Sequence, residues 1–425
     1  MSAPTPAGKD RSFAALVGAQ FFGAFNDNLF KQLVLLLAAG TLFPGKDLQG
    51  VAFAALSLPF VIFSGLAGDL SERYSKRTII VWMKVAEIFI CLGTIWALMS
   101  MSWTLMLVVL AILGTQSAFF GPSKYGVIPE IVKADRLIPA NGMITMTTFL
   151  AVLTGQALAG PLMDAFGPRA DVPRLWVPGL FCVGFAVIGT VMVYGMRPLP
   201  AMNPNQHIGK SPFGDLFKTI KTLRQDRRLF RVLLLNSFLW FNSGVLNQAV
   251  NGLKAPGYLA LEKDSYLSIL LSTISVGIIL GSLAAPRFAA RFGLGKVTAA
   301  GVFGMLTLQV GLLAIGTVVG PEAGFYVALI LLIFIGFSGA ASIVSVQSWL
   351  QDAPPPGMRG QTFAVNNFLN FLFLFGAGVF YLLANLVGPT IVQVLSALAL
   401  LGWYLFIRRD VANMHIGSES VAVSR

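Results

Sequence analysis

Twelve apolar runs, each long enough to cross the hydrocarbon core of a bilayer, constrain this chain more than any other feature. An α-helix of about 20 residues spans roughly 30 Å of hydrocarbon and satisfies its backbone hydrogen bonds internally. The sequence therefore predicts an all-α integral membrane protein. Some runs meet with little spacer, so ten or eleven spans are an alternative. The expected spans are 13–43, 49–68, 78–99, 103–121, 140–165, 175–196, 229–250, 265–285, 297–319, 324–349, 361–385 and 388–408.

The composition supports a membrane location and argues against several function classes. The 425 residues are 56% hydrophobic and 11% charged, with a mean hydropathy of +0.76, whereas soluble domains carry about 25% charged residues. The two cysteines lie inside apolar runs, and the two histidines stand far from any cluster. We find no nucleophile–base spacing, metal cluster or phosphate loop. We therefore expect no enzyme, no cofactor and no metal.

The loop charges predict the topology. Most of the 30 Lys and Arg residues lie in loops on the side of the N-terminus. The positive-inside rule then places both termini and the long basic loop in the cytoplasm, and topology explains the net charge of +12 without a nucleic-acid partner. The short polar N-terminal stretch does not resemble a signal peptide, so the first run should remain as a helix. The basic residues on the opposite side are Lys46, Arg169, Arg174, Lys254 and Lys263.

The long basic loop divides the map into six spans and six spans. We expect an N-terminal half over 1–196, a cytoplasmic linker over 197–228, and a C-terminal half with a short tail over 229–425. The two halves show faint similarity, since four residues of the first span recur at identical spacing in the seventh. This layout favours two repeated halves around a midplane site. The recurring residues are Gln20, Phe22, Phe25 and Asn26, matched by Asn236, Phe238, Phe241 and Asn242.

The first span carries charges at membrane depth. A buried charge there costs about 2.5–3.5 kcal/mol even on lenient scales. Asp27 and Lys31 are four residues apart, so they share a helix face and can pair. They form either a polar cavity wall that meets a substrate or a proton, or a structural ion pair. Asn26 and Asn28 project to other faces and belong to the same candidate site or bond neighbouring helices.

Two further groups complete the candidate substrate and gating residues. Lys84 and Glu87 are three apart in the third span and can neutralise each other, with structural and functional interpretations equally open. The second half carries amides where the first carries charges. Asn247 and Asn370 are the candidate site residues of this group. The amides either form hydrogen bonds between helices or line a cavity for a polar headgroup.

Small residues mark two sites of close helix approach. Gly65 and Asp69 follow the second span, with Arg73 and Arg77 beyond them, and this pattern resembles the cytoplasmic gating motif of the major facilitator superfamily. The resemblance implies conformational latching. In the fifth span, a small-residue stripe before Gly160-Pro161 fits a hinge or a packing seam.

Three segments extend the resemblance to one branch of that superfamily. They are Gln20–Asn28, Gly121–Glu130 and Ala140-Asn141-Gly142. Together they resemble the bacterial lysophospholipid transporter family, also seen as the transporter portion of transporter–acyltransferase fusions. The resemblance implies a major-facilitator-type bundle of 12 transmembrane helices in the bacterial cytoplasmic (inner) membrane. It also implies movement of lysophosphatidylethanolamine and lysophosphatidylglycerol to the inner leaflet, where a partner acyltransferase re-acylates them. Asp27 and Lys124 match charged positions of the family motifs.

The chain departs from the family pattern in its second half. The family has an Arg in the seventh span and a Glu in the eleventh, whereas this chain has Asn247-Gln248 and Asn370 there. Two alternatives therefore remain open. One is a proton-linked exporter of amphipathic drugs or metabolites with Asp27 as the proton carrier. The other is a non-transporting scaffold whose basic loop binds anionic membrane lipids. We expect a monomer and no acyltransferase domain within the chain.

Overall fold

The computed structural model is a helical bundle, and it describes residues 11–39, 41–133, 137–205, 213, 216–254, 258–354 and 358–414. Within these residues it contains twelve long helices and two short ones. Eleven helices are long and apolar enough to cross a membrane. The middle of the predicted linker and both chain ends lie outside the described residues.

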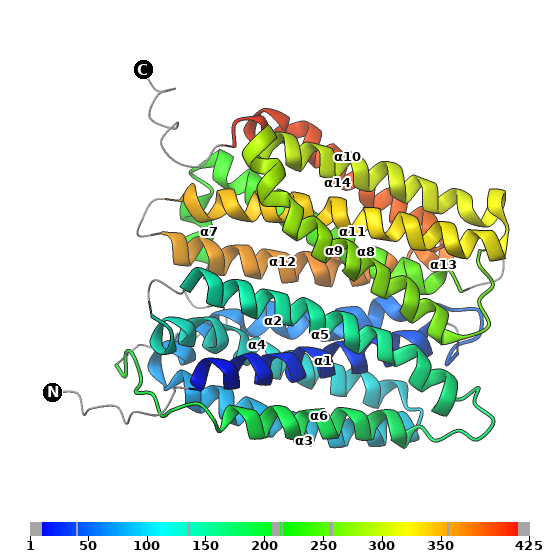
Figure 1. Ribbon diagram of the computed structural model, residues 1–425, viewed down its shortest axis with the longest axis horizontal. Coiled ribbons are helices and arrows are strands. Elements are labelled where there is room, and N and C mark those ends of the chain that lie inside the picture. The colour runs from blue at the N-terminus through cyan, green and yellow to red at the C-terminus, as the bar shows by residue number, and fades with distance from the viewer. Residues whose placement is uncertain are drawn as a thin grey trace.

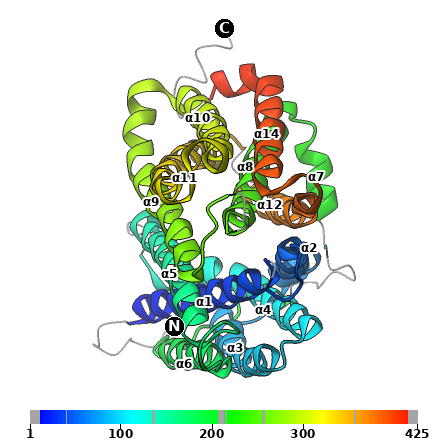
Figure 2. The same ribbon diagram turned by 90° about the vertical axis from the view of Figure 1, so that its right-hand side faces the viewer.

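The first six long helices form the first half of the bundle, and the other six form the second half (Figures 1 and 2). The first half comprises α1 (Ser12–Ala38), α2 (Gln49–Arg73), α3 (Lys76–Met99), α4 (Trp103–Ile131), α5 (Leu137–Phe166) and α6 (Trp176–Val193). The second half comprises α8 (Arg227–Gly252), α9 (Asp264–Phe292), α10 (Leu294–Ala314), α11 (Pro321–Asp352), α12 (Arg359–Tyr381) and α14 (Pro389–Ala412). The short helices are α7 (Leu216–Leu223) and α13 (Ala384–Val387), and a π-helical turn follows α10 over Ile315–Val319.

The helix α1 is long enough to span but is not among the eleven most apolar helices. Its polar residues, Asn26 to Asn28 with Lys31 and Gln32, lower its hydropathy. The helix nevertheless lies against α5, α6 and α2. Because its neighbours cover it, α1 can carry polar groups that a lipid-facing helix does not tolerate.

The two halves meet along two pairs of helices, α2 with α12 and α5 with α9. The described chain begins and ends at the end of the bundle that carries α7, on the left of Figure 1. We call this the α7 end and the opposite one the far end. Because α1 starts and α14 finishes at the α7 end, the chain runs from one end of the bundle to the other an even number of times.

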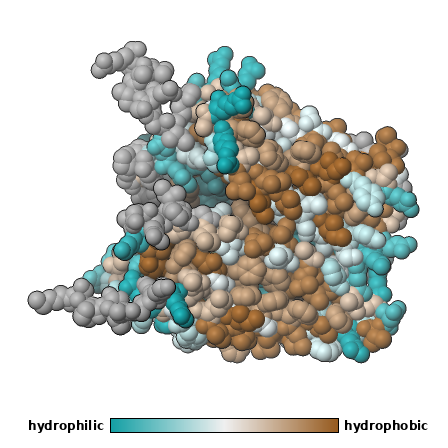
Figure 3. Space-filling model, viewed as in Figure 1, coloured by the Kyte–Doolittle hydropathy of each residue, from teal (hydrophilic) through white to brown (hydrophobic). Residues whose placement is uncertain are grey.

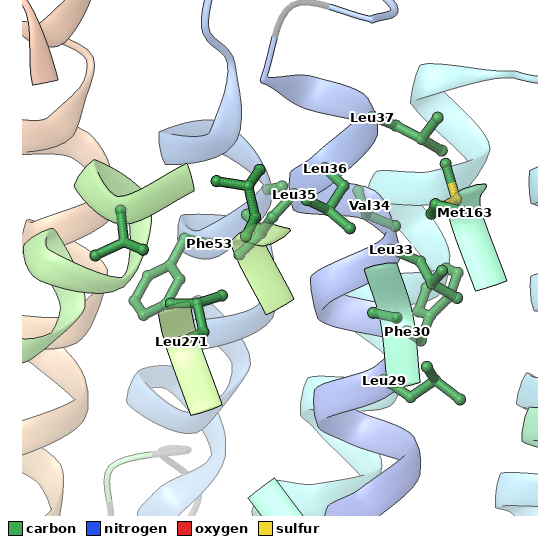
Figure 4. Packing of buried hydrophobic residues seen from close by; sticks show 14 of the residues in the cluster. Leu29, Phe30, Leu33, Val34, Leu35, Leu36, Leu37, Phe53, Met163 and Leu271 are labelled. Atoms are coloured by element: carbon green, nitrogen blue, oxygen red, sulfur yellow. The ribbon is translucent and has the colours of Figure 1, made fainter. Parts of the chain in front are cut away.

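Apolar side chains fill the bundle and cover its flank. Figure 4 shows Leu29, Leu33 and Leu37 of α1 packed among neighbouring helices in the largest buried cluster. On the outside, Phe89 is 69% exposed and Trp96 is 66% exposed. Figure 3 shows apolar side chains over the flank and polar ones towards the two ends. This band is the surface that a bilayer covers in a multi-pass membrane protein.

The small-residue stripe of α5 proves to be a packing seam. A Cβ atom on Gly155 would lie 2.6 Å from the carbonyl oxygen of Phe25, so only glycine lets α5 approach α1 this closely. Ala151 and Ala159 are fully buried in the same seam. Further along, the amide of Gly160 donates to Ser268 Oγ at 2.8 Å, which joins α5 to α9 at the far end.

The predicted span boundaries differ most from the structure at the ends of two helices. The fourth span was expected to end at residue 121, but α4 continues to Ile131 and includes Pro122 and Pro129. The eighth was expected to end at residue 285, but α9 continues through Pro286 to Phe292. Proline removes one backbone donor, yet a membrane helix tolerates it when neighbouring groups satisfy the freed carbonyl. The length of the apolar run therefore underestimates the length of both helices.

Candidate substrate cavity

A cavity of about 1530 Å³ lies between the two halves. Phe213, Leu216 and Thr219 line one part of it, so it extends towards α7. Residues of α1 to α5 form its first-half wall, and residues of α8, α11 and α12 form its second-half wall. Of the predicted site residues, it is lined by Asp27, Asn28, Gly65, Asp69, Lys84, Glu87, Lys124 and Asn370.

Asp27 projects from α1 into the cavity and is held by α4. The hydroxyl of Ser117 donates to Asp27 Oδ2 at 2.6 Å. The other carboxylate oxygen, Oδ1, is buried and has no hydrogen-bond partner in the part of the chain that the structure describes. Asp27 therefore keeps an acceptor for a group that enters the cavity.

Lys31 does not pair with Asp27 as the four-residue spacing allowed. Its ammonium instead donates to Asn28 Oδ1 at 2.7 Å, within α1. Asn28 in turn donates to the carbonyl of Ala24 at 2.8 Å. On this helix face Lys31 can reach either Asp27 or Asn28, and its ammonium binds the side-chain amide of Asn28. Lys31 is not among the described cavity-lining residues.

Lys84 and Glu87 form a buried ion pair, as their spacing in α3 allows. Lys84 Nζ lies 2.5 Å from Glu87 Oε2, and both side chains are 1% exposed. Asn26 of α1 donates to Glu87 Oε1 at 2.9 Å and to the carbonyl of Cys182 at 3.1 Å. Asn26 thus joins α1 to α3 and α6 behind the cavity wall. Lys84 does not extend to the membrane surface.

Lys124 lies inside α4 and not in a loop on the cytoplasmic side, which corrects its predicted place. Its residue is 8% exposed and its ammonium lies 4.4 Å from the ring centroid of Tyr125. The segment around it was expected to form a loop because it contains Gly121, Pro122 and Gly126. Helix packing overrides those breakers, and Lys124 becomes a cation of the cavity wall.

The second-half wall holds a cluster of amides. Asn236 Nδ2 donates to Asn366 Oδ1 at 3.0 Å and to Asn370 Oδ1 at 3.2 Å. The other predicted amide, Asn247, is not among the described residues that line the cavity, and its Oδ1 is buried without a partner. The structure thus brings Asn370 to the cavity and leaves Asn247 outside it.

The predicted conformational motif divides between the cavity and the helix ends. Gly65 and Asp69 line the cavity at the end of α2. Arg73 lies over the ring of Tyr74 at 5.9 Å, and Arg77 Nε donates to the carbonyl of Met196 at 3.2 Å. Both arginines therefore make local contacts within the first half.

The far end is closed by polar side chains from both halves, which we call the amide latch (Gln32, Gln49, Gln248 and Asn251, with Asp47, Tyr381 and Asn385). Gln32 of α1 donates to Asn251 Oδ1 at 2.9 Å. Asn251 of α8 donates to Gln49 Oε1 at 2.8 Å. Asn385 donates to the carbonyl of Asp47 at 2.8 Å and accepts from the amide of Asp47 at 2.6 Å. The cavity is therefore accessible from the α7 end and sealed at the far end.

Glycines at the far end let the halves touch. A Cβ atom on Gly378 of α12 would lie 2.6 Å from the carbonyl oxygen of Gly50 in α2. Such an approach leaves no space for a side chain. Two halves with an open end, a sealed end and a polar cavity between them have the arrangement of repeat-built transporters.

The sequence matches the family model of the Major Facilitator Superfamily over residues 16–379. The chain belongs to the Major Facilitator Superfamily. This member is 25% identical over 387 residues to the "Lysophospholipid transporter LplT" of Yersinia pestis (strain Pestoides F), a match that covers 90% of this chain and 89% of the relative. The same identity and coverage hold for the protein of that name from Yersinia pseudotuberculosis serotype I (strain IP32953).

Solved structures share the fold of this superfamily member at low identity. A bacterial homologue of the human lysosomal transporter Spinster, in an inward-facing and unoccupied conformation, matches with a TM-score of 0.68 at 13% identity, covering 96% of this chain and 98% of that one. A POT family transporter in complex with 5-aminolevulinic acid matches with a TM-score of 0.71 at 12% identity, with the same coverage. Together with the family match, these likenesses identify the chain as a multi-pass membrane transporter.

Several cavity residues were not singled out as candidates from the sequence. They are Ser117, Gln116, Thr148, Trp240, Gln347 and Gln351. Each is a polar or aromatic residue within an apolar helix, which is a weak signal because such residues also bond between helices. Only their convergence on one cavity distinguishes them.

Proposed function

We propose that the chain transports lysophospholipids, including lysophosphatidylethanolamine and lysophosphatidylglycerol, to the inner leaflet of the bacterial cytoplasmic membrane by alternating access. An acyltransferase would re-acylate them there. The observation that carries the proposal is the amphipathic character of the cavity. A lipid with one acyl chain needs a polar place for its headgroup and an apolar surface for its tail.

The charged part of the cavity is the first-half wall. Asp27 supplies an unpaired carboxylate oxygen, and Lys124 supplies a cation. A phospholipid headgroup carries a negative phosphate together with hydroxyl or ammonium donors. The two side chains therefore offer partners for both kinds of group.

The apolar part includes stacked aromatic rings that bridge the halves. Phe60 of α2 and Phe371 of α12 lie with ring centroids 3.9 Å apart and planes within 6° of parallel, and both line the cavity. The volume of about 1530 Å³ exceeds the roughly 300–1,000 Å³ typical of small-molecule sites. An acyl chain is a suitable occupant of the additional, apolar space.

We assign the α7 end to the cytoplasm. Basic residues gather there, among them Lys221, Arg224 and Arg228, which the positive-inside rule places in the cytoplasm. On this assignment both termini are cytoplasmic and the cavity faces inwards. The amide latch then closes the outer end, and its opening admits substrate from the outer leaflet.

Reconstitution in liposomes tests the proposal. Fluorescent lysophosphatidylethanolamine is followed across the bilayer with wild-type protein, Asp27→Ala and the control Asp171→Ala, since Asp171 is exposed outside the cavity. We expect protein-dependent movement that falls at least tenfold in Asp27→Ala and stays unchanged in the control. A folded wild-type protein that moves no lysolipid but carries a cationic dye along a pH gradient would replace the proposal with a proton-linked exporter.

A further inference from the structure

The two walls of the cavity differ in charge. The first-half wall holds five acids and lysines, whereas none of the described cavity-lining residues of α8, α11 and α12 is ionisable. The five are Asp27, Asp69, Lys84, Glu87 and Lys124. Six of the described side chains of the second-half wall carry N–H groups. Three of them form what we call the donor wall (Trp240 of α8 with Asn366 and Asn370 of α12). Their geometry makes this uncharged wall a source of hydrogen-bond donors.

Asn236 fixes the orientation of both asparagines of the donor wall. Its Nδ2 group donates to the carbonyl oxygens of Asn366 and Asn370, at 3.0 and 3.2 Å. The hydroxyl of Ser237 also donates to Asn370 Oδ1, at 3.1 Å. Asn236 and Ser237 are fully buried, so this clamp lies behind the wall. The carbonyl oxygens of the two asparagines are therefore already engaged.

The amide nitrogens of Asn366 and Asn370 remain for the cavity. The residues are 5% and 7% exposed and line the cavity, and within the described part of the chain their Nδ2 groups have no hydrogen-bond partner. A side-chain amide has one acceptor and one donor end. With the acceptor ends held by Asn236, the donor ends are the groups offered to a ligand.

Trp240 adds a third donor. Trp240 lines the same cavity, and its indole Nε1 is buried without a hydrogen-bond partner among the described residues. An indole nitrogen can donate but cannot accept. A buried donor without an acceptor is unfavourable, so this N–H favours a ligand that brings an acceptor oxygen.

We propose that the donor wall is a charge-neutral subsite for the phosphate oxygens of the substrate, and that Asn236 is its positioning residue. This inference rests on the proposed lipid transport and specifies how the headgroup is held. Across the cavity, the unpaired Oδ1 of Asp27 accepts the hydroxyl or ammonium end of the same headgroup. One headgroup then contacts both halves, so its binding depends on the position of the two halves relative to each other.

The first test removes one donor and keeps the ring. In Trp240→Phe the indole N–H is lost, and Trp82→Phe is the control because Trp82 is 65% exposed on α3. We expect the KM for fluorescent lysophosphatidylethanolamine in proteoliposomes to rise about three- to tenfold in Trp240→Phe, with little change in maximal rate. An unchanged KM would overturn the proposal.

The second test reverses the polarity of the wall. Asn370→Asp replaces the amide donor with a negative acceptor at nearly constant shape, and Asn236→Leu removes the clamp. We expect Asn370→Asp to raise KM more than Trp240→Phe and Asn236→Leu to raise KM with maximal rate retained. If thermal unfolding in detergent shows that Asn370→Asp or Asn236→Leu does not fold, Trp240→Phe alone decides.

Binding in detergent separates this proposal from the transport proposal. Glycerophosphoethanolamine, which has the headgroup but no acyl chain, and inorganic phosphate are titrated while the heat of binding is recorded by calorimetry for wild type and Trp240→Phe. A signal with glycerophosphoethanolamine that disappears in Trp240→Phe supports the donor wall even if no lipid moves in liposomes. A stronger response to inorganic phosphate would assign the wall to a free phosphate and overturn the lipid headgroup. No response to either probe would overturn the subsite.

Discussion

Asn251 of α8 and Gln49 of α2 join the two halves of the transporter at the far end, with Asn251 Nδ2 donating to Gln49 Oε1 at 2.8 Å. Asn251 also accepts from Gln32 of α1, so one side chain ties two first-half helices to the second half. Because these bonds exist only while the far end is closed, they stabilise the arrangement in which the cavity faces the α7 end.

Replacing Asn251 should open the far end. Asn251→Leu removes two hydrogen bonds between the halves, each worth about 1 kcal/mol, which shifts the equilibrium by about 5- to 30-fold. A cysteine placed at Ser64, in the cavity, should then react that much faster with an impermeant maleimide added from the far side. Asn413→Leu at the α7 end is the matched control. Equal rates in both variants would show that the latch does not govern access.

Closure at the far end should also depend on pH through Asp47. Burial raises the pKa of this carboxyl above its ordinary value of 3.8, although hydrogen bonds from Gln49 and Tyr381 oppose the shift. The closed end therefore favours the protonated form and loses stability as the pH rises from the ordinary pKa through the raised one. Labelling from the far side should increase over that range. In Asp47→Asn the increase should disappear, and its persistence would assign the titration to another group.

A side chain at the point of closest approach should prevent closure. In Gly378→Val the new Cβ would meet the Gly50 carbonyl at 2.6 Å and the Ala54 amide at 2.8 Å, both backbone atoms that cannot rotate away. We expect at least a tenfold loss of transport with normal expression, and labelling from the far side should rise. Gly376→Val is the control, since the added atom would have open space there. Equal activity of the two variants would contradict the assigned contact.

Removing one charge of the buried ion pair of α3 should destabilise the protein. Glu87→Gln leaves the Lys84 ammonium, 1% exposed, without its counter-charge, and such a change destabilises a protein by about 3–5 kcal/mol. The thermal unfolding temperature in detergent should therefore fall. Lys84→Met combined with Glu87→Gln removes both charges and should recover most of the loss. If the double variant unfolds as early as the single one, the pair has another role than mutual neutralisation.

Helix count and the ion pair of α3 were predictable because both follow from local rules. Long apolar runs must be helical in a bilayer, and two residues three apart on a helix share a face. The spacing of Lys84 and Glu87 was enough to predict that they can pair.

Lys124 and Lys31 show where local rules fail. Glycine and proline around Lys124 predicted a loop, but packing of α4 against α2 and α3 extends the helix through them. For Lys31, two partners were within reach along α1, and the sequence did not say that Asn28 would take its ammonium. Both outcomes depend on tertiary contacts that a single sequence does not reveal.

The amide latch was the hardest part to foresee. Gln32, Gln49 and Asn251 come from three helices and are separated by up to 219 positions along the chain. No repeat or spacing links them, and each has the ordinary appearance of a polar residue near a helix end.

The charge difference between the two cavity walls determines how a membrane voltage can act on this protein. A potential of 100 mV does about 2.3 kcal/mol of work on an elementary charge that crosses the whole membrane. Within the described cavity lining, the acids and lysines all belong to the first half and the residues of α8, α11 and α12 are neutral; the first-half residues are Asp27, Asp69, Lys84, Glu87 and Lys124. Because these side chains are of both signs, the electrical forces on them largely cancel, and within the cavity a voltage acts mainly on a charged cargo.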